Sequence, residues 1–123
     1  MISHNKFMSR KIIVVDDERD VAETMMEVLH KEGYDVDVAL SGEECLNKVK
    51  ENSLVMLDVM MPGMNGYSVA KLLKEKYQKK INIVFVTIKS KSEVNLENVD
   101  GFIQKPFIIQ DLVSVAKTFI KSA

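Results

Sequence analysis

The sequence predicts an α/β fold in which helices cover both faces of a parallel sheet. Short apolar runs alternate five times with segments of helical periodicity along the 123 residues. Because each crossover must bring the chain back before the next strand can start in the same direction, this alternation favours a parallel sheet. Hydrophobic residues make up 46% of the chain, which is enough for a single core, so we expect one domain.

Five apolar runs are expected to form the strands. They span residues 11–15, 34–38, 54–57, 81–86 and 102–104. The first is a continuous run rich in β-branched residues, which is typical of a strand buried on both faces. The second alternates apolar and polar residues, as half-exposed strands do. We therefore expect the first strand inside the sheet and the second at its edge.

Helices are expected after the first, second, third and fifth strands. The first helix should end at Gly33, and Ser41 and Glu44 have the spacing of a capping box that would open the second. The expected inner faces contain Val21, Met25, Val28 and Leu29; Cys45, Leu46 and Val49; Val69, Ala70, Leu73 and Tyr77; and Leu112, Val115, Ala116, Phe119 and Ile120. Cys45 is thus expected to be a small core residue.

The fourth crossover, residues 88–101, has a weaker helical pattern. Ser90 and Glu93 have the spacing of a capping box, but the three apolar residues that follow do not fall on one helical stripe. A crossover of 14 residues that also supplies two loops leaves room for about ten helical residues at most. We predict a short or irregular fourth helix that is more mobile than the others.

The composition argues against several classes of function. The formal net charge is -1 and the pI is near 6.1, so no overall basic field favours nucleic acid. The single cysteine cannot form an internal disulfide, and no apolar run approaches the roughly 20 residues of a membrane helix. Residues 1–9 lack the features of a secretion signal and are expected to be a flexible leader. We therefore expect a cytoplasmic protein without a membrane segment.

Polar side chains gather where four of the expected strands end. Asp16 and Asp17 follow the first strand, Asp58 follows the third, Thr87 ends the fourth, and Lys105 follows the fifth. Taken alone, Asp58 could simply hydrogen-bond the turn that comes after it. In open parallel sheets, however, ligands bind beyond the carboxyl ends of the strands, and the five side chains would converge there.

The motifs around these residues resemble those of a known family. They are VVDDE after the first strand, LDVMMPGMNG at the third, VT at the fourth and KPF after the fifth. Over roughly residues 10–121, the chain is similar to the receiver domain of two-component response regulators. The resemblance implies a flavodoxin-like, doubly wound sheet of five parallel strands in the order 2-1-3-4-5, within a receiver domain of residues 10–123.

The resemblance also implies a divalent cation at the strand ends. Asp16, Asp17 and Asp58 would lie close together, and three neighbouring carboxylates would repel one another and raise at least one pKa. Hard oxygen ligands suit Mg²⁺, and Mn²⁺ is also possible. By resemblance, Asp17 and Asp58 would bind the ion directly, Asp16 would bind it through water, and the backbone carbonyl of Met60 would complete the protein's ligands.

The function implied by the resemblance is that of a phosphoacceptor signalling domain. Asp58 would take a phosphoryl group from a histidine kinase or a phosphotransfer protein, while Lys105 neutralises the transferring oxygens and Thr87 hydrogen-bonds the product. Movement of Thr87 would then vacate space for Phe102, the expected switch aromatic, and change the surface offered to a downstream protein target. The chain would be no enzyme beyond its own phosphorylation and dephosphorylation.

Several alternatives stay open at this point. A hydrolase of the haloacid dehalogenase type would carry its nucleophile at the first strand, with a second acid two residues later, where this chain has Glu18, and would need a longer chain for its cap. A degenerate receiver that only binds or dimerises would lack the Asp, Thr or Lys, which are all present.

Phe102 could be a plain core residue. Ile88 stands where the family usually has a small residue, so we expect it to crowd the site and slow phosphate loss, unless it packs away.

Overall fold

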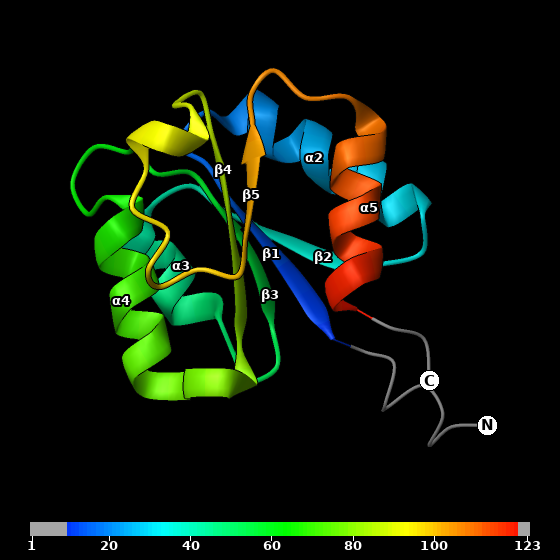
Figure 1. Cartoon of the computed structure of the whole chain (residues 1–123). Coiled ribbons are helices and arrows are strands. Elements are labelled where there is room, and N and C mark those ends of the chain that lie inside the picture. Colours follow the sequence, from blue (N-terminus) through cyan, green and yellow to red (C-terminus); the bar gives the residue numbers. More distant parts are fainter. Residues whose placement is uncertain (1–9, 121–123) are drawn as a thin grey trace.

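The computed structural model of the chain describes residues 10–120. In this part of the chain, five parallel strands form one sheet in the order β2-β1-β3-β4-β5 (Figure 1), so both the predicted fold class and the implied strand order are confirmed. The strands are β1 (Lys11–Val15), β2 (Asp35–Ala39), β3 (Leu54–Leu57), β4 (Asn82–Thr87) and β5 (Gly101–Gln104). The leader predicted for residues 1–9 lies outside the described residues.

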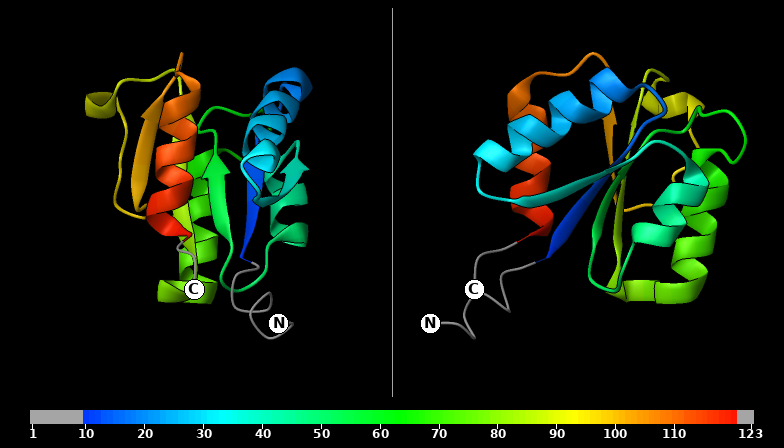
Figure 2. Two further views of the ribbon diagram at one scale, coloured as in Figure 1. Left: turned by 90° about the vertical axis from the view of Figure 1, so that its right-hand side faces the viewer. Right: turned by 180° about the vertical axis from the view of Figure 1, so that it is seen from behind.

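Within residues 10–120, four α-helices cover the two faces of the sheet. The helices are α2 (Arg19–Lys31), α3 (Gly42–Lys48), α4 (Gly66–Tyr77) and α5 (Ile109–Phe119), and the two 3-10 turns are η1 (Gln78–Lys80) and η2 (Lys91–Glu93). Helices α2 and α5 pack on one face, and α3 and α4 pack on the other (Figure 2). Between residues 10 and 120, no helix is both long enough and apolar enough to cross a membrane.

Strand β1 contributes to the core on both faces. Ile13 and Val15 belong to the cluster beneath α3 and α4, while Ile12 and Val14 belong to the cluster beneath α2 and α5. All four side chains are buried, because successive residues of a strand point to opposite faces. The predicted core residue Cys45 is also buried, and this burial raises the pKa of its thiol to about 12.

The predicted helix ends agree with the structure, with two local differences. Gly33 follows the end of α2 with a left-handed φ of 97°. The Ser41 hydroxyl accepts the N–H of Glu44 at 3.0 Å, as in a capping box, but the Glu44 carboxylate accepts the N–H of Leu40 rather than that of Ser41. Val49, predicted to lie on the inner face of the helix, is the extended residue that ends α3, and it remains buried.

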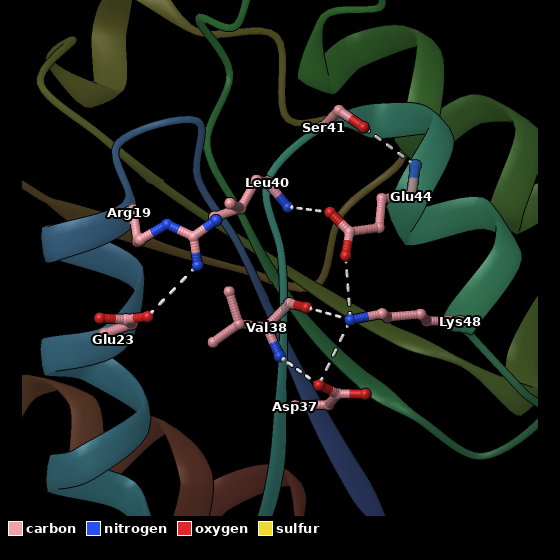
Figure 3. A network of polar contacts seen from close by, with 8 residues as sticks. All are labelled: Arg19, Glu23, Asp37, Val38, Leu40, Ser41, Glu44 and Lys48. Carbon is pink, nitrogen blue, oxygen red and sulfur yellow. Dashed lines mark hydrogen bonds and ion pairs between the residues drawn. The ribbon is translucent and has the colours of Figure 1, made fainter.

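The outer edge of β2 is blocked by side chains (Figure 3). Because the carbonyl of Ala39 bonds into the sheet, the backbone groups of its neighbour Val38 point to the open edge. The N–H of Val38 donates to Asp37 Oδ1 at 2.8 Å, and its carbonyl accepts from Lys48 Nζ at 2.6 Å. Lys48 is held there by ion pairs to Asp37 and Glu44. These contacts protect the predicted edge strand from pairing with another strand.

Arg10 connects several segments at the end of the sheet where the strands begin. Its guanidinium donates to the backbone carbonyls of Asn52 and Phe119, to the side chain of Asn82 at 2.9 Å and to the carbonyl of Ser53 at 3.3 Å. These partners come from the start of β3, the start of β4 and the end of α5. Burial lowers the pKa of Arg10, but an arginine still stays charged.

The fourth crossover contains only the single 3-10 turn η2, so the prediction of a short or irregular helix is confirmed. The carboxylate of Glu93 accepts the N–H of Ser90 at 2.8 Å and so holds this turn. The chain then runs without regular structure to β5, and Val94, Leu96 and Val99 pack against the sheet. The cover beside α4 is therefore thinner than the helical cover elsewhere.

Candidate functional site

Strand pairing brings two acids together at the carboxyl end of the sheet. Val15 and Leu57 face each other in the register of β1 and β3. The N–H of Asp58 continues this ladder by donating to the carbonyl of Val15 at 3.0 Å, and the N–H of Asp16 bonds to β2 in the same way. Asp16 and Asp58 are therefore fixed by the backbone of the sheet rather than by loop packing.

The three predicted acids form one cluster. Each of Asp16, Asp17 and Asp58 offers a carboxylate oxygen, and these oxygens all lie within 4.8 Å of one another. Asp16 and Asp58 are buried, with 2% and 8% of their surface exposed, whereas Asp17 is open to solvent. Such a set of hard oxygen donors with one open side fits a cation like Mg²⁺, which keeps several of its waters.

Lys105 extends from the end of β5 into this cluster. Its Nζ donates to Asp16 Oδ2 at 2.6 Å and to Asp58 Oδ2 at 3.3 Å. The backbone N–H of Lys105 also donates to the carbonyl of Thr87 at 2.8 Å, which anchors the residue to β4. The lysine thus lies close enough to neutralise charge on Asp58 or on a group bound to it.

The pKa of Asp58 is raised, as predicted for one of the acids, but the main cause differs from the predicted one. Burial is the largest reason that the pKa of Asp58 is raised, and the charge of Asp16 adds to it, while Lys105 and the N–H of Met60 oppose the rise. Burial alone would lower the pKa of Lys105, but its contacts with Asp16 and Asp58 outweigh that and raise it. The expected raised pKa is present, but desolvation rather than repulsion among the acids dominates it.

Asp58 both hydrogen-bonds the turn that follows it and faces the acid cluster, so the two alternatives considered for it hold together. Its Oδ1 accepts the N–H of Met60 at 3.2 Å, as a strand-end aspartate does, while its Oδ2 faces Lys105. Gly66 follows this turn as the first residue of α4. A Cβ at Gly66 would lie 2.3 Å from the carbonyl oxygen of Asp58, so only glycine allows this close approach at the start of α4.

Thr87 and Phe102 lie on the neighbouring strands β4 and β5. Thr87 is fully buried at the end of β4, and its hydroxyl accepts the N–H of Lys89 at 3.4 Å. Phe102 is partly buried and lies opposite Phe85 in the register of β4 and β5. Ile88, directly after Thr87, is 68% exposed, so its side chain does not pack into the core.

Comparison with known proteins shows the family. The chain matches the family model described as response regulator receiver domain over residues 12–117. It is 35% identical to the response regulator TrrA of Thermotoga maritima, whose structure was solved in complex with Mg²⁺ and BeF; the match covers 89% of this chain and 98% of that one, with a TM-score of 0.80. A chain in the structure of the histidine kinase ThkA in complex with TrrA is 34% identical, with 91% and 99% covered and a TM-score of 0.80.

A third structure agrees with these two. The BeF3-activated receiver domain of DrrB, a Thermotoga maritima protein, is 30% identical, with 93% of this chain and 99% of that one covered and a TM-score of 0.82. The sheet order, the acid cluster and the lysine beside it therefore agree with the family match over most of the chain. The chain belongs to the response regulator receiver domain family.

Proposed function

We propose that this chain receives a phosphoryl group on Asp58 and passes the signal on through a changed protein surface. The observation that supports this most is the convergence of Asp16, Asp17, Asp58 and Lys105 at one end of the sheet. The receiver domain is proposed to span residues 10–123. Its only chemistry would be its own phosphorylation and dephosphorylation.

The proposed residues that would hold a divalent cation are the three acids and one backbone group. Asp17 and Asp58 would bind it directly, Asp16 through water, and Met60 through its carbonyl. The contact of 2.6 Å between Asp16 and Lys105 agrees with an indirect role for Asp16, because one of its oxygens is already engaged. When bound, Mg²⁺ or Mn²⁺ would neutralise part of the charge on the phosphoryl oxygens.

The phosphoryl transfer itself would use Asp58 as the nucleophile. A carboxylate oxygen of Asp58 forms the new bond to phosphorus as the bond between phosphorus and the donor's histidine nitrogen breaks, and that nitrogen keeps the electron pair. The attacking carboxylate must be ionised, and Lys105 favours that form from 3.3 Å away. As charge grows on the phosphoryl oxygens, the same ammonium can turn toward them.

The proposed switch begins at Thr87. Its hydroxyl accepts only a weak bond from the N–H of Lys89, at 3.4 Å, so it is free to turn and donate its O–H to a phosphoryl oxygen. A shift of Thr87 would change the packing around Phe102 on the neighbouring strand. The charge event at Asp58 would in this way bias the surface that a downstream protein reads.

The phosphoryl donor would be a histidine kinase or a phosphotransfer protein. The related structure that holds ThkA together with TrrA supports a kinase partner. Apolar side chains are exposed on the loops around the acid cluster and at the start of α5, where a docking partner could cover them. They are Met60, Ile88, Ile108 and Ile109.

Intact-mass spectrometry tests the proposal. Acetyl phosphate should add one phosphoryl group to the wild type when Mg²⁺ or Mn²⁺ is present and none when the metal is chelated. Asp58→Asn should take no phosphate, while Asp35→Asn, which changes an exposed acid on β2, should behave as the wild type. Equal labelling of Asp58→Asn would overturn the site. An unlabelled wild type would indicate a degenerate binding module, and continuous turnover of acetyl phosphate at an enzymatic rate would indicate a hydrolase.

A further inference from the structure

A hollow of about 670 Å³ opens between α4 and the irregular crossover that follows β4. Figure 1 shows this crossover running down beside α4 toward β5. Tyr67, Ala70 and Phe85 form the apolar part of its lining. Ala70 and Phe85 are buried, and the ring of Tyr67 meets Phe85 edge-on with 5.6 Å between centroids. The apolar lining therefore belongs to the packed core.

A second hollow of about 460 Å³ continues the first along α4. The two share Glu97 and Asn98, and the second reaches Gln78 just beyond the end of the helix. We call the two hollows together the α4 groove. From Tyr67 to Gln78 the groove follows α4 for about 17 Å at 1.5 Å per residue, which is the length of about three helical turns.

Acidic side chains line the first hollow of the α4 groove. Glu75 projects from α4, and Glu93 and Glu97 belong to the crossover, against which Lys71 is the one cation in that lining. Glu93 is held in place by the N–H and the hydroxyl of Ser90, at 2.8 and 3.0 Å. The second hollow carries two lysines and two acids, so it is electrically balanced. Over both hollows the lining holds four acids and three lysines, so the excess of negative charge lies in the first hollow.

We propose that the α4 groove binds a basic amphipathic helix of a partner protein. A helix fits because the position beside α4 has a thin, irregular cover where the other crossovers place helices. Lysine or arginine side chains of the partner would meet Glu75, Glu93 and Glu97, and an apolar side chain would reach Tyr67. This goes beyond phosphorylation of Asp58, since none of the residues that line the groove belongs to the acid cluster or is Lys105.

The test uses a labelled peptide of about 14 residues with leucine and lysine at helical spacing. Binding to the full chain is followed by fluorescence anisotropy at low salt with EDTA, so that metal and phosphate play no part. We expect this peptide to bind at least ten-fold more tightly than a counterpart with glutamate in place of lysine. Amide shifts in NMR spectra should change at residues 67–75 and 93–98. Shifts centred on α2 and α5 would overturn the assignment.

Charge reversal separates the groove from general attraction. Glu75→Lys with Glu97→Lys should weaken binding at least ten-fold, and it leaves the bonds between Glu93 and Ser90 intact. The matched control, Glu27→Lys with Glu32→Lys, makes the same change of net charge at exposed positions on and just after α2, and should stay within two-fold of the wild type. An equal loss in both variants would refute the proposal. So would a dimer in sedimentation that only the groove variant abolishes, because a second copy would then fill the groove.

These experiments are independent of the proposed phosphorylation. A failure to label Asp58 with acetyl phosphate would leave the peptide result untouched, and a failure of the peptide to bind would leave the labelling untouched.

Discussion

Replacing Asp58 with asparagine should stabilise the metal-free protein at neutral pH, although it removes the proposed phosphoacceptor. The carboxylate of Asp58 is buried, lies within 4.8 Å of the Asp16 carboxylate and has only Lys105 as a compensating charge among the residues that the structure describes. Asparagine has nearly the same shape but carries no charge. Lys105 would keep its closer contact with Asp16 at 2.6 Å, so the substitution leaves no unpaired ammonium.

The magnitude follows from the distances. With an effective dielectric constant of 20, repulsion from Asp16, which has a carboxylate oxygen within 4.8 Å, is about 3.5 kcal/mol or more, and attraction to Lys105 at 3.3 Å is about 5 kcal/mol. These two contributions largely cancel, so what remains is dominated by the loss of hydration of a buried carboxylate, which amounts to several kcal/mol. Asp58→Asn removes this hydration penalty, but it also removes the part of the attraction to Lys105 that exceeds the repulsion from Asp16. We therefore expect the variant to gain about 1–2 kcal/mol in unfolding free energy.

The sign also follows from the raised pKa of Asp58. An acid whose folded pKa lies above its unfolded value favours folding fully only at pH below the unfolded value, and that contribution is lost as the pH rises through the folded pKa. The ionised Asp58 should therefore lower the unfolding free energy of the wild type at neutral pH. This loss should disappear in acid, where Asp58 becomes protonated. The advantage of the asparagine variant should shrink as the pH falls toward the ordinary pKa of an aspartate.

Thermal unfolding followed by circular dichroism measures this difference. For a chain of this size, about 1–2 kcal/mol corresponds to a rise in Tm of roughly 4–8 °C in EDTA at neutral pH. Mg²⁺ at ten times its Kd should stabilise the wild type by about 1.4 kcal/mol. The variant lacks one of the proposed metal ligands, so the difference in Tm between variant and wild type should become smaller. Asp35→Asn should change the stability by less than about 0.5 kcal/mol. A lower Tm for Asp58→Asn in EDTA would show that Lys105 outweighs burial.

Four further predictions concern other parts of the chain. Asp17→Asn should weaken Mg²⁺ binding about ten-fold or more in calorimetric titration, and an unchanged affinity would refute its role as a direct ligand. Ile88→Ala should lose phosphate faster in a mass-spectrometric time course, because the exposed isoleucine is expected to restrict access to the site; an equal or slower decay would remove the idea. Residues 91–99 should exchange amide hydrogens faster than α5, whether or not the chain is phosphorylated, and equal protection would contradict the predicted mobility. Arg10→Met should lower the unfolding free energy in urea by about 2–4 kcal/mol through the loss of charged hydrogen bonds, whereas the exposed control Lys11→Met should change it little.

The acid cluster could be predicted from the sequence because its geometry depends on few rules. Buried strands end where the apolar run ends, and parallel strands place those ends at one edge of the sheet. Asp16, Asp58 and Lys105 each lie within one residue of a strand end, so an error of one residue in a boundary hardly moves them. The weak fourth crossover was likewise predictable, because its length and apolar spacing leave little room for a buried helical face.

Other features depend on distant contacts that no local pattern encodes. Arg10 stands next to the predicted leader, yet its partners at Asn82 and Phe119 lie far along the chain. The need for glycine at position 66 arises from the path of the chain after Asp58, not from turn chemistry alone. The dominant part of burial in raising the pKa of Asp58 could not be predicted either, because the extent of burial and the opposing effect of Lys105 both depend on the folded packing.

The two ends of the sheet are stabilised in opposite ways, and this suits a switch. At the carboxyl end, buried ions balance one another, so added charge on Asp58 must redistribute the contacts of Lys105. At the amino end, the partners of Arg10 in the described part of the chain are neutral carbonyl and amide oxygens, whose hydrogen bonds do not depend on the ionisation of the site. Salt largely screens the interaction between exposed charges that are more than a Debye length apart. The strands that connect the two ends of the sheet are packed on both faces, which makes them rigid. The response to phosphorylation should therefore be confined to the carboxyl end of the sheet, at Phe102 and in the loops after β4 and β5, while the opposite end holds the strands in register.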